Sequence, residues 1–544
     1  MSFALGRPLR RASLLGLLCL VGCDGQRGAQ SHPSERDWVL VTTEHFRVYS
    51  DLDGEEVQAL ATDLEQDLAL IGQAAFQSPA AVVEPTDVVI FSRRGHFQRY
   101  FPKSIGGVAY HRLPLLPESH HTVVTFEQLG TAMNTTLRHE LVHDMYARNF
   151  GAAPPWLNEG VAQYFSTVEL IGGQIHIGVP LPDRAVTKRP YPFTVVDKGT
   201  VIQAIPRTMI PAASALLQMS AEDFYGPTKA PSDEEGTAPE ALANYFGAWA
   251  LVHYLMGQNG EYSHRFQTFL KVVTTTSVSA AWDEAFSGVD MQKLDEEFRA
   301  FLAAGQFALL GVPYRPPARA PSPTVQALRE GEKHVLLAKL ALARARFGQT
   351  ASVFSEELDA AIHAKPPPAE AYYLRGMYAQ SLDKDIEAER DFVTALRLAP
   401  DDPHILRASL VLRFDRHHGE LTAQERPQFH AEIAKLERIA SSPGDLLFVA
   451  HFYATLGDVP RALTIGARAV SRSPVDPLVL DMYARLLASC DHLEQAIATQ
   501  RRAIDFLNED QALRQRLQRN LERMLAQLAQ PKQDTPSALP ATER

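Results

Sequence analysis

Two histidines and a glutamate stand at a spacing that suits metal-assisted hydrolysis. His139, Glu140 and His143 form the pattern His-Glu-x-x-His in a helical context. Residues i and i+4 of a helix lie on one face, so both imidazoles can offer a nitrogen to one zinc ion at about 2.0–2.1 Å. Glu140 lies one residue round the helix, where its carboxylate can take a proton from a water molecule. A surface helix carrying the same three residues would show the same pattern, so more residues are needed to define a site.

A second segment supplies a possible third ligand. Residues 156–162 are Trp-Leu-Asn-Glu-Gly-Val-Ala. This segment resembles the gluzincin metallopeptidases, above all the aminopeptidase N relatives, in which the third zinc ligand is a glutamate on the next helix. The resemblance implies that Glu159 is that ligand and that the fourth position stays open for water, as in catalytic zinc sites. The loop after His143 is shorter than in those relatives and resembles the peptidase MA-like domains. The alternative for Glu159 is an ordinary carboxylate at a helix start, stabilised by the helix dipole.

A third segment, residues 245–255, resembles the helix of aminopeptidase N relatives that opens with a tyrosine and continues as an apolar stretch. In that family the tyrosine hydroxyl hydrogen-bonds the oxyanion, which implies the same role for Tyr245. The alternative is a core tyrosine, because Trp249 and Val252 continue its helical stripe. His253 is another possible oxyanion donor, although a histidine among apolar residues is more often part of the core.

Two departures from these relatives limit the comparison. Upstream of His139 there is no Gly-x-Met-Glu-Asn segment, the element that captures a free amino terminus in aminopeptidases, so an endopeptidase is expected rather than an exopeptidase. Thermolysin-like enzymes place an aspartate four residues beyond the glutamate ligand to orient a ligating histidine, and Gln163 stands there instead. The orienting partner must come from elsewhere, and Asp144 is a candidate.

The elements that must position these residues mix strands and helices. One amphipathic helix is expected where apolar residues recur at spacings of three and four, and four short β-branched or aromatic runs are typical of strands. The expected strands cover residues 38–43, 46–49, 88–91 and 123–126, and the expected helix covers residues 57–71. With the motifs above, these elements predict an α+β, zincin-like domain.

Beyond residue 332 the sequence becomes helical and repetitive. Small, aromatic and proline residues fall at positions 4, 8, 20, 24 and 32 of a 34-residue unit, the pattern of tetratricopeptide (TPR) repeats: Tyr372, Gly376, Ala388, Phe392 and Pro400. Small residues at positions 8 and 20 let the two helices of a unit approach closely, and the aromatic residue fills the groove between them. Further copies follow at the same period, so an all-α, TPR-like solenoid is predicted.

The first residues indicate export and a lipid anchor. Arg7, Arg10 and Arg11 precede an apolar run, residues 14–20, that is too short to span a bilayer and is typical of a secretory signal. The run ends at Leu-Val-Gly-Cys, which resembles the lipobox of bacterial lipoproteins, so Cys23 is expected to carry the lipid. This resemblance implies a protein of the bacterial cell envelope, on the periplasmic side or at the cell surface.

The predicted organisation has six parts. A proline-rich run suggests a semi-rigid linker between the two folded regions, and the polar C-terminal tail has the composition of a disordered segment. The parts are a signal peptide, 1–22; a tether, 23–37; the metallopeptidase-like domain, 38–305; the linker, 306–332; the TPR-like repeats, 333–528; and the tail, 529–544.

Composition and net charge limit the classes of molecule that the protein is expected to bind. With 45% hydrophobic and 22% charged residues over 544 positions, the chain falls in the ordinary globular range. Its net charge of −11 argues against nucleic acid as a partner, because a protein that binds nucleic acid needs a concentrated basic face. Of the three cysteines, only Cys490 lies outside the signal and anchor, and a buried small hydrophobe is the simpler interpretation of it than a reactive thiol.

Together these patterns predict a lipid-anchored zinc endopeptidase that acts on proteins or peptides with one Zn²⁺ per chain. Glu140 would act as general base, and the concave face of the repeats would bind a substrate or a partner protein. The alternative is a non-catalytic interaction protein in which the repeats are the functional part. In that case the peptidase-like domain would be inert or would only bind metal.

Overall fold

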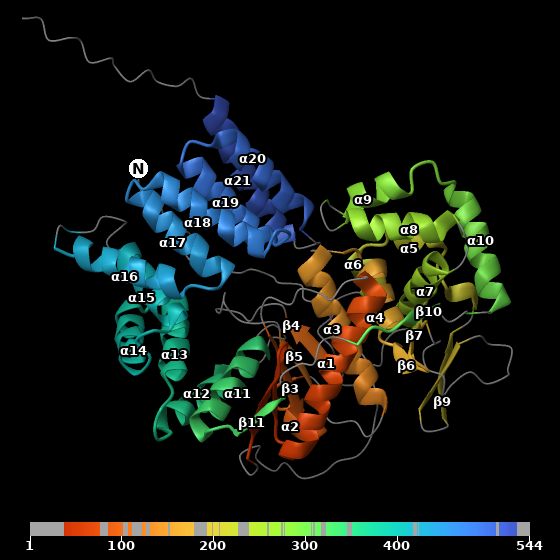
Figure 1. Ribbon diagram of the computed structural model, residues 1–544, viewed down its shortest axis with the longest axis horizontal. Helices are drawn as coiled ribbons and strands as arrows, with labels where there is room; N and C mark the ends of the chain where they lie inside the picture. The colour runs from red at the N-terminus through yellow and green to blue at the C-terminus, as the bar shows by residue number, and fades with distance from the viewer. Residues whose placement is uncertain are drawn as a thin grey trace, which may run out of the picture. The chain divides into compact units, whose positions relative to one another are not determined.

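The computed structural model (Figure 1) divides the chain into two compact units, with the boundary between Ile439 and Ala440. It describes residues 37–76, 85–101, 107–110, 122–126, 131–150, 153–178, 193–197, 200–205, 207–226, 239–257, 261–273, 276, 278–305, 307, 310–316, 322–344, 351–416, 422, 424–507 and 511–529. The predicted signal peptide, lipid-bearing Cys23 and nearly all of the tether and of the C-terminal tail lie outside the described residues. In the described part, no helix combines the length and the apolar character that crossing a membrane requires.

A six-stranded mixed sheet forms the centre of the first unit. Its order is β11-β1-β2-β3-β5-β4, with β2, β3 and β5 parallel to one another and the other neighbours antiparallel. The strands are β1 (Val39–Thr42), β2 (Phe46–Ser50), β3 (Thr86–Phe91), β4 (Gly107–Tyr110), β5 (Thr122–Phe126) and β11 (Thr324–Ala327). The strands expected at residues 38–43, 46–49, 88–91 and 123–126 are therefore confirmed as β1, β2, β3 and β5.

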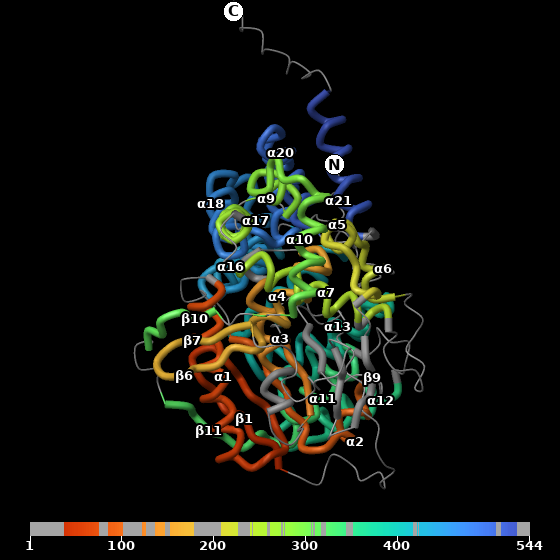
Figure 2. The backbone as a smooth tube through the Cα atoms, turned by 90° about the vertical axis from the view of Figure 1, so that its right-hand side faces the viewer, coloured from red at the N-terminus to blue at the C-terminus, as the bar shows by residue number. Residues whose placement is uncertain are grey.

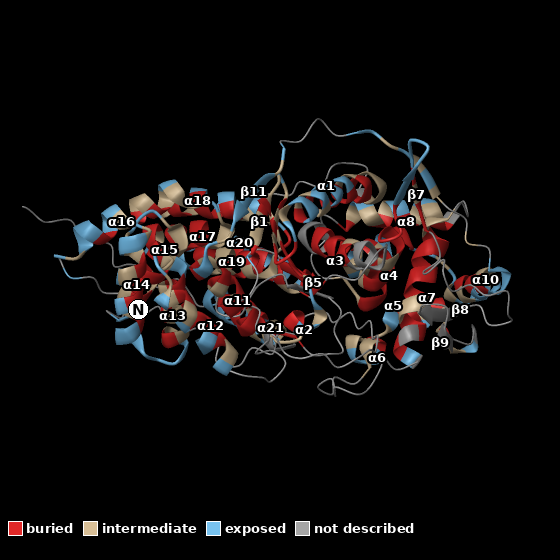
Figure 3. Ribbon diagram, turned by 90° about the horizontal axis from the view of Figure 1, so that it is seen from below, coloured by how far each residue is buried: buried red, intermediate tan, exposed pale blue. Residues whose placement is uncertain are grey.

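Helices that carry the candidate site cover one face of this sheet (Figure 1). The first of them, α1 (Gly54–Phe76), presents the apolar stripe that the sequence predicted, with Val57, Leu64 and Ile71 buried. Next to it lie α3 (Thr131–Phe150) and α4 (Pro155–Phe165), and α7 (Pro239–Met256) packs against α4; all four helices share the same apolar core. In Figure 3, which colours residues by burial, α7 and α4 are largely red.

Smaller elements surround α4 and α7. A separate three-stranded sheet, ordered β10-β7-β6, appears above β1 and β11 in Figure 2. Its strands are β6 (Glu169–Ile171), β7 (Gln174–Ile177) and β10 (Leu310–Pro313), and a hairpin consists of β8 (Phe193–Asp197) and β9 (Thr200–Ile205). The remaining helices are α2 (Arg94–Phe97), η2 (Arg207–Met209), α5 (Ala213–Gln218), α6 (Ala221–Tyr225), α8 (Glu261–Val272), α9 (Val278–Ala285) and α10 (Met291–Ala304).

The opposite face of the main sheet packs against helices from the predicted repeat region. Trp38, Phe91 and Val124 of the sheet belong to one buried cluster with Leu337 and Phe354, which lie on α11 (Glu330–Arg344) and α12 (Ala351–His363). Both faces of the sheet are therefore covered, one by the helices of the candidate site and the other by the first repeat helices. The mixed α/β region and the helical region that follows it agree with the predicted fold class at this coarse level.

The segment predicted as a linker, residues 306–332, includes two strands. This segment contributes β10, which pairs antiparallel with β7, and β11, which pairs antiparallel with β1 at the edge of the main sheet. A run rich in proline favours extended backbone, and an extended segment can pair as an edge strand where its N–H groups allow it. The compact unit that contains the sheet continues past the predicted boundary at residue 332 to Ile439, and α11 and α12 share a buried cluster with the sheet.

Helices follow one another in packed pairs from α11 onward. In the first unit the pair α11 and α12 is followed by α13 (Ala369–Ser381), α14 (Asp385–Leu398), α15 (Pro403–Arg416) and α16 (Arg426–Ile439). The second unit holds α17 (Pro443–Thr455), α18 (Val459–Arg472), α19 (Pro477–Ser489), α20 (Leu493–Asp505) and α21 (Gln511–Ala529). The close approach predicted within the unit at residues 369–400 is confirmed, because a Cβ on Gly376 would lie 2.6 Å from the Phe392 ring.

Candidate metal centre

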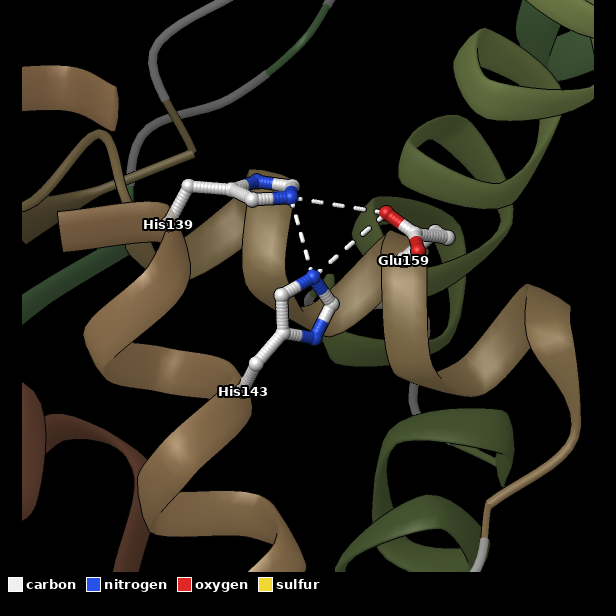
Figure 4. Close-up of side chains that lie close together, drawn as sticks. All are labelled: His139, His143 and Glu159. Carbon is white, nitrogen blue, oxygen red and sulfur yellow. Dashed lines mark hydrogen bonds and ion pairs between the residues drawn. The ribbon is translucent and has the colours of Figure 1, made fainter. Parts of the chain in front are cut away.

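Two consecutive helices on the α1 side of the main sheet build the site. His139 and His143 lie one turn apart on α3, so both imidazoles project from the same face of this helix (Figure 4). After a short connection α4 begins at Pro155, and proline at the first helical position is favoured because its fixed φ suits the helix and its missing N–H needs no partner there. Glu159 lies in the second turn of α4 and points at the two histidines (Figure 4).

The three side chains meet with the spacing of a metal-ligand set. His139 Nε2 and His143 Nε2 lie 3.0 Å apart, and Glu159 Oε2 lies 3.4 Å from the first and 3.6 Å from the second. Four ligands arranged tetrahedrally around zinc at about 2.0–2.1 Å stand about 3.3–3.4 Å from one another. Among the described residues, these three are the only group of histidine, cysteine and acidic side chains found with such an arrangement. The predicted ligands His139, His143 and Glu159 are therefore brought together.

The Glu159 carboxylate is buried, and the neighbouring histidines stabilise its charge. Glu159 is fully buried, and an isolated buried carboxylate would be strongly disfavoured. Burial acts to raise the pKa of Glu159, but His143 and His139 outweigh it and lower that pKa to about 2. Burial likewise acts to lower the pKa of His143, but the charge and hydrogen bond of Glu159 raise it to about 9. In the absence of metal, a proton on His143 thus compensates the charge of Glu159.

Glu140 also occupies a buried position, with 3% of its surface exposed. Its carboxylate oxygen Oε1 is fully covered and has no hydrogen-bond partner in the described structure. The carboxylate is near enough to His143 to contribute electrostatically to the raised pKa of that histidine. A buried acceptor without a partner carries a desolvation cost, and a water molecule beside the histidines would satisfy it. The residues present therefore fit a metal ion with a water at its open position.

Asn158 orients one of the histidines. The Nδ1–H of His143 donates to Asn158 Oδ1 at 3.0 Å, which leaves Nε2 directed at His139 and Glu159. Such a hydrogen bond at the far ring nitrogen fixes the ring and the tautomer of a metal-ligating histidine. Asp144, the predicted candidate for this orienting role, accepts a hydrogen bond from Thr86 Oγ1 at 2.8 Å on β3. The residue that orients His143 is thus Asn158, next to Glu159, a position that lies within the motif but that the sequence analysis did not identify.

Tyr225 reaches the site from a distant part of the sequence. Its hydroxyl donates to Glu159 Oε1 at 3.0 Å, while Glu159 Oε2 faces the histidines. The two residues are separated by 66 positions, and Tyr225 lies on the short helix α6 in a stretch without a recognisable motif. No spacing rule connects such a residue to the site, so only the fold identifies it.

Tyr245 lies at the edge of this group. Its half-buried ring stands 6.0 Å from the ring of Tyr225 and 5.4 Å from that of Phe224. Tyr225 thus lies between Tyr245 and Glu159, and the role of Tyr245 as an oxyanion donor stays a prediction. His253 lies in the core, with 2% exposure, against the rings of Trp249 and Phe307, but neither ring nitrogen has a hydrogen-bond partner in the described structure.

A comparison of the whole chain with protein-family models and with curated protein sequences found no match. The evidence for a function therefore comes from the geometry of the site and from the sequence motifs.

Proposed function

We propose that the protein is a zinc-dependent metalloendopeptidase of the gluzincin type. The observation that carries this proposal is the convergence of His139, His143 and Glu159 beside a buried Glu140 whose Oε1 has no hydrogen-bond partner in the described structure. A structural zinc site closes its coordination with four protein ligands, whereas three ligands leave a position for water or substrate. The combination of three ligands with an unsatisfied base is the arrangement that hydrolysis requires.

In this mechanism His139 Nε2, His143 Nε2 and Glu159 Oε2 would hold one zinc ion. A zinc ion bound there would lower the pKa of water towards 7 and polarise the carbonyl of the scissile peptide bond. Glu140 would take the proton of the attacking water at Oε1 and then pass it to the nitrogen of the leaving amine. The hydroxyl of Tyr245 would donate a hydrogen bond to the carbonyl oxygen as negative charge develops there.

The rest of the chain would determine where the enzyme is located and which proteins it binds. The lipobox-like sequence at Cys23 supports a lipid anchor, and hence a location in the bacterial cell envelope, on the periplasmic side or at the surface. The helical pairs from α11 onward support a repeat array whose concave face binds a protein substrate or partner. No Gly-x-Met-Glu-Asn segment precedes His139, which supports cleavage within chains rather than removal of terminal residues.

The proposal is tested by measuring zinc content and casein cleavage together on a purified soluble form that lacks residues 1–23. One zinc per chain, with cleavage that a chelator abolishes and added zinc restores, is the expected result. Protein that binds no zinc and cleaves nothing would instead support the interaction-protein alternative. Stoichiometric zinc without cleavage would support a domain that only binds metal.

A further inference from the structure

The two oxygens of the Glu159 carboxylate have different partners. Oε2 lies 3.4 Å and 3.6 Å from the Nε2 atoms of His139 and His143. Oε1 accepts a hydrogen bond of 3.0 Å from the hydroxyl of Tyr225. A carboxylate can bind a metal ion through one oxygen or through both. A hydrogen-bond donor on one oxygen therefore affects how many metal–oxygen bonds the carboxylate forms.

Three features fix the short helix α6, which carries Tyr225. At the start of α6 the hydroxyl of Ser220 accepts a hydrogen bond from the Asp223 amide at 3.1 Å, which caps the helix. At its end, Asn244 on α7 donates to the backbone carbonyls of Asp223 at 3.2 Å and of Phe224 at 2.9 Å. Phe224 itself is fully buried.

Asn244 has this function because it is itself fixed. It is 7% exposed on α7, and its amide reaches the last carbonyls of α6, which lack partners within so short a helix. The chain then leaves α6 at Gly226 with φ of +83°, a conformation that glycine adopts without strain. We call the segment Ser220–Gly226 the α6 strap.

We infer that Tyr225 is a positioning residue which keeps Glu159 a one-oxygen metal ligand. This inference rests on the proposed function, since it requires a metal ion at the triad. The tyrosine engages Oε1 while Oε2 faces the histidines, so the hydrogen bond favours metal binding through Oε2 and leaves the position of a second carboxylate bond to water and substrate. Asn244 and the α6 strap set the reach of the hydroxyl.

Cobalt provides a direct test, because Co²⁺ has the same preference for this kind of site as zinc and its visible absorption distinguishes four from five ligands. The full chain is purified in detergent, stripped of metal and loaded with Co²⁺, and the visible spectra of wild type and Tyr225→Phe are compared. The substitution keeps the ring and removes only the donor. We expect the intense absorption of a four-coordinate site in the wild type and its loss to the weaker absorption of a five-coordinate site in Tyr225→Phe.

Two further variants separate positioning from packing. Tyr254→Phe is the matched control, because the Tyr254 hydroxyl also donates to a carboxylate at 3.0 Å, that of Glu297, and its spectrum should equal the wild type. Asn244→Ala leaves Tyr225 in the chain but removes its support, and it should shift the spectrum in the same direction as Tyr225→Phe.

The outcomes are distinguishable from failure of the proposed function itself. Wild-type protein that takes up no Co²⁺ would contradict the metal site. Stoichiometric uptake with the same spectrum in wild type and Tyr225→Phe would overturn the role of Tyr225 while leaving the metal site intact. A wild-type spectrum already typical of five ligands would overturn it as well.

Discussion

At the scale of single residues, a proton and a metal ion compete for the same nitrogen of His143. The raised pKa of His143, about 9, and the lowered pKa of Glu159, about 2, describe a metal-free pair that carries one proton between these values. Relative to the ordinary values of 6.5 and 4.5, the histidine stabilises the metal-free fold below pH 6.5 and loses this effect as the pH rises through about 9. The glutamate stabilises it above pH 4.5 and loses this effect as the pH falls through about 2.

Zinc binding should therefore release about one proton per chain at pH 7, because His143 must give up its proton to bind the metal. The apparent affinity should rise with pH and level off above about pH 9. Calorimetric titration in buffers with different ionisation enthalpies measures the number of protons released. A release near zero at pH 7 would contradict the ion pair described here.

Local geometry decides which of these residues could be predicted. The i and i+4 spacing of His139 and His143 defines their relative position on any helix, so the sequence was sufficient for them. Glu159 required the resemblance of its surrounding segment to a known motif. Tyr225 depends on how α6 folds back over α4, and nothing in the sequence near it indicates this contact.

At the scale of elements, close packing between α4 and α7 determines the position of Glu159. A Cβ on Gly160 would lie 2.5 Å from the backbone oxygen of Ala248 and 2.8 Å from Val252, so α4 and α7 approach as closely as a glycine allows. Because Gly160 directly follows Glu159, this contact also sets the depth at which the carboxylate enters the site. The glycine of the motif is thus required by the structure.

Gly160→Ala should destabilise the protein by about 1–3 kcal/mol, because the helices must separate to accept the methyl group. The shift of α4 should also weaken zinc binding. Gly95→Ala is the matched control, since a Cβ there meets nothing within 4 Å on the helix α2. Chemical denaturation and zinc titration of both variants check the expectation, and an unchanged midpoint and affinity for Gly160→Ala would contradict it.

The two edge strands β10 and β11 mark a limit of sequence-based prediction at this scale. Residues 310–313 and 324–327 flank a proline-rich run, and composition alone predicts extended, unpaired chain there. β10 and β11 form as strands because they pair with β7 and β1, which lie far away in the sequence. Long-range strand pairing of this kind carries no local signal.

At the scale of the whole molecule, the main sheet lies between the helices of the candidate site and the helices α11 and α12. Its second face, with Trp38, Phe91 and Val124, is covered by α11 and α12 in a single buried cluster. Both helices belong to the same compact unit as the sheet, and this unit continues to Ile439. α11 and α12 therefore form part of the fold that supports the candidate site.

A chain that ends at residue 316 should aggregate or unfold without cooperativity, because it loses β11 and exposes the second apolar face of the sheet. A chain that ends at residue 439 keeps the whole first unit and should unfold as one cooperative transition. Size-exclusion chromatography and thermal denaturation compare the two truncations. Soluble, cooperatively folded protein ending at residue 316 would show that the repeats are dispensable for the sheet.

The measurement that tests the central claim most directly pairs zinc content with peptide cleavage in wild type and Glu140→Gln. The substitution preserves the size of the side chain and leaves all three ligands in place, but it removes the base. We expect one zinc per chain in both proteins and a loss of casein cleavage of at least about 100-fold in the variant. Glu169→Gln, at an exposed position on β6, should behave as wild type. Equal cleavage by Glu140→Gln and wild type would contradict the proposed mechanism.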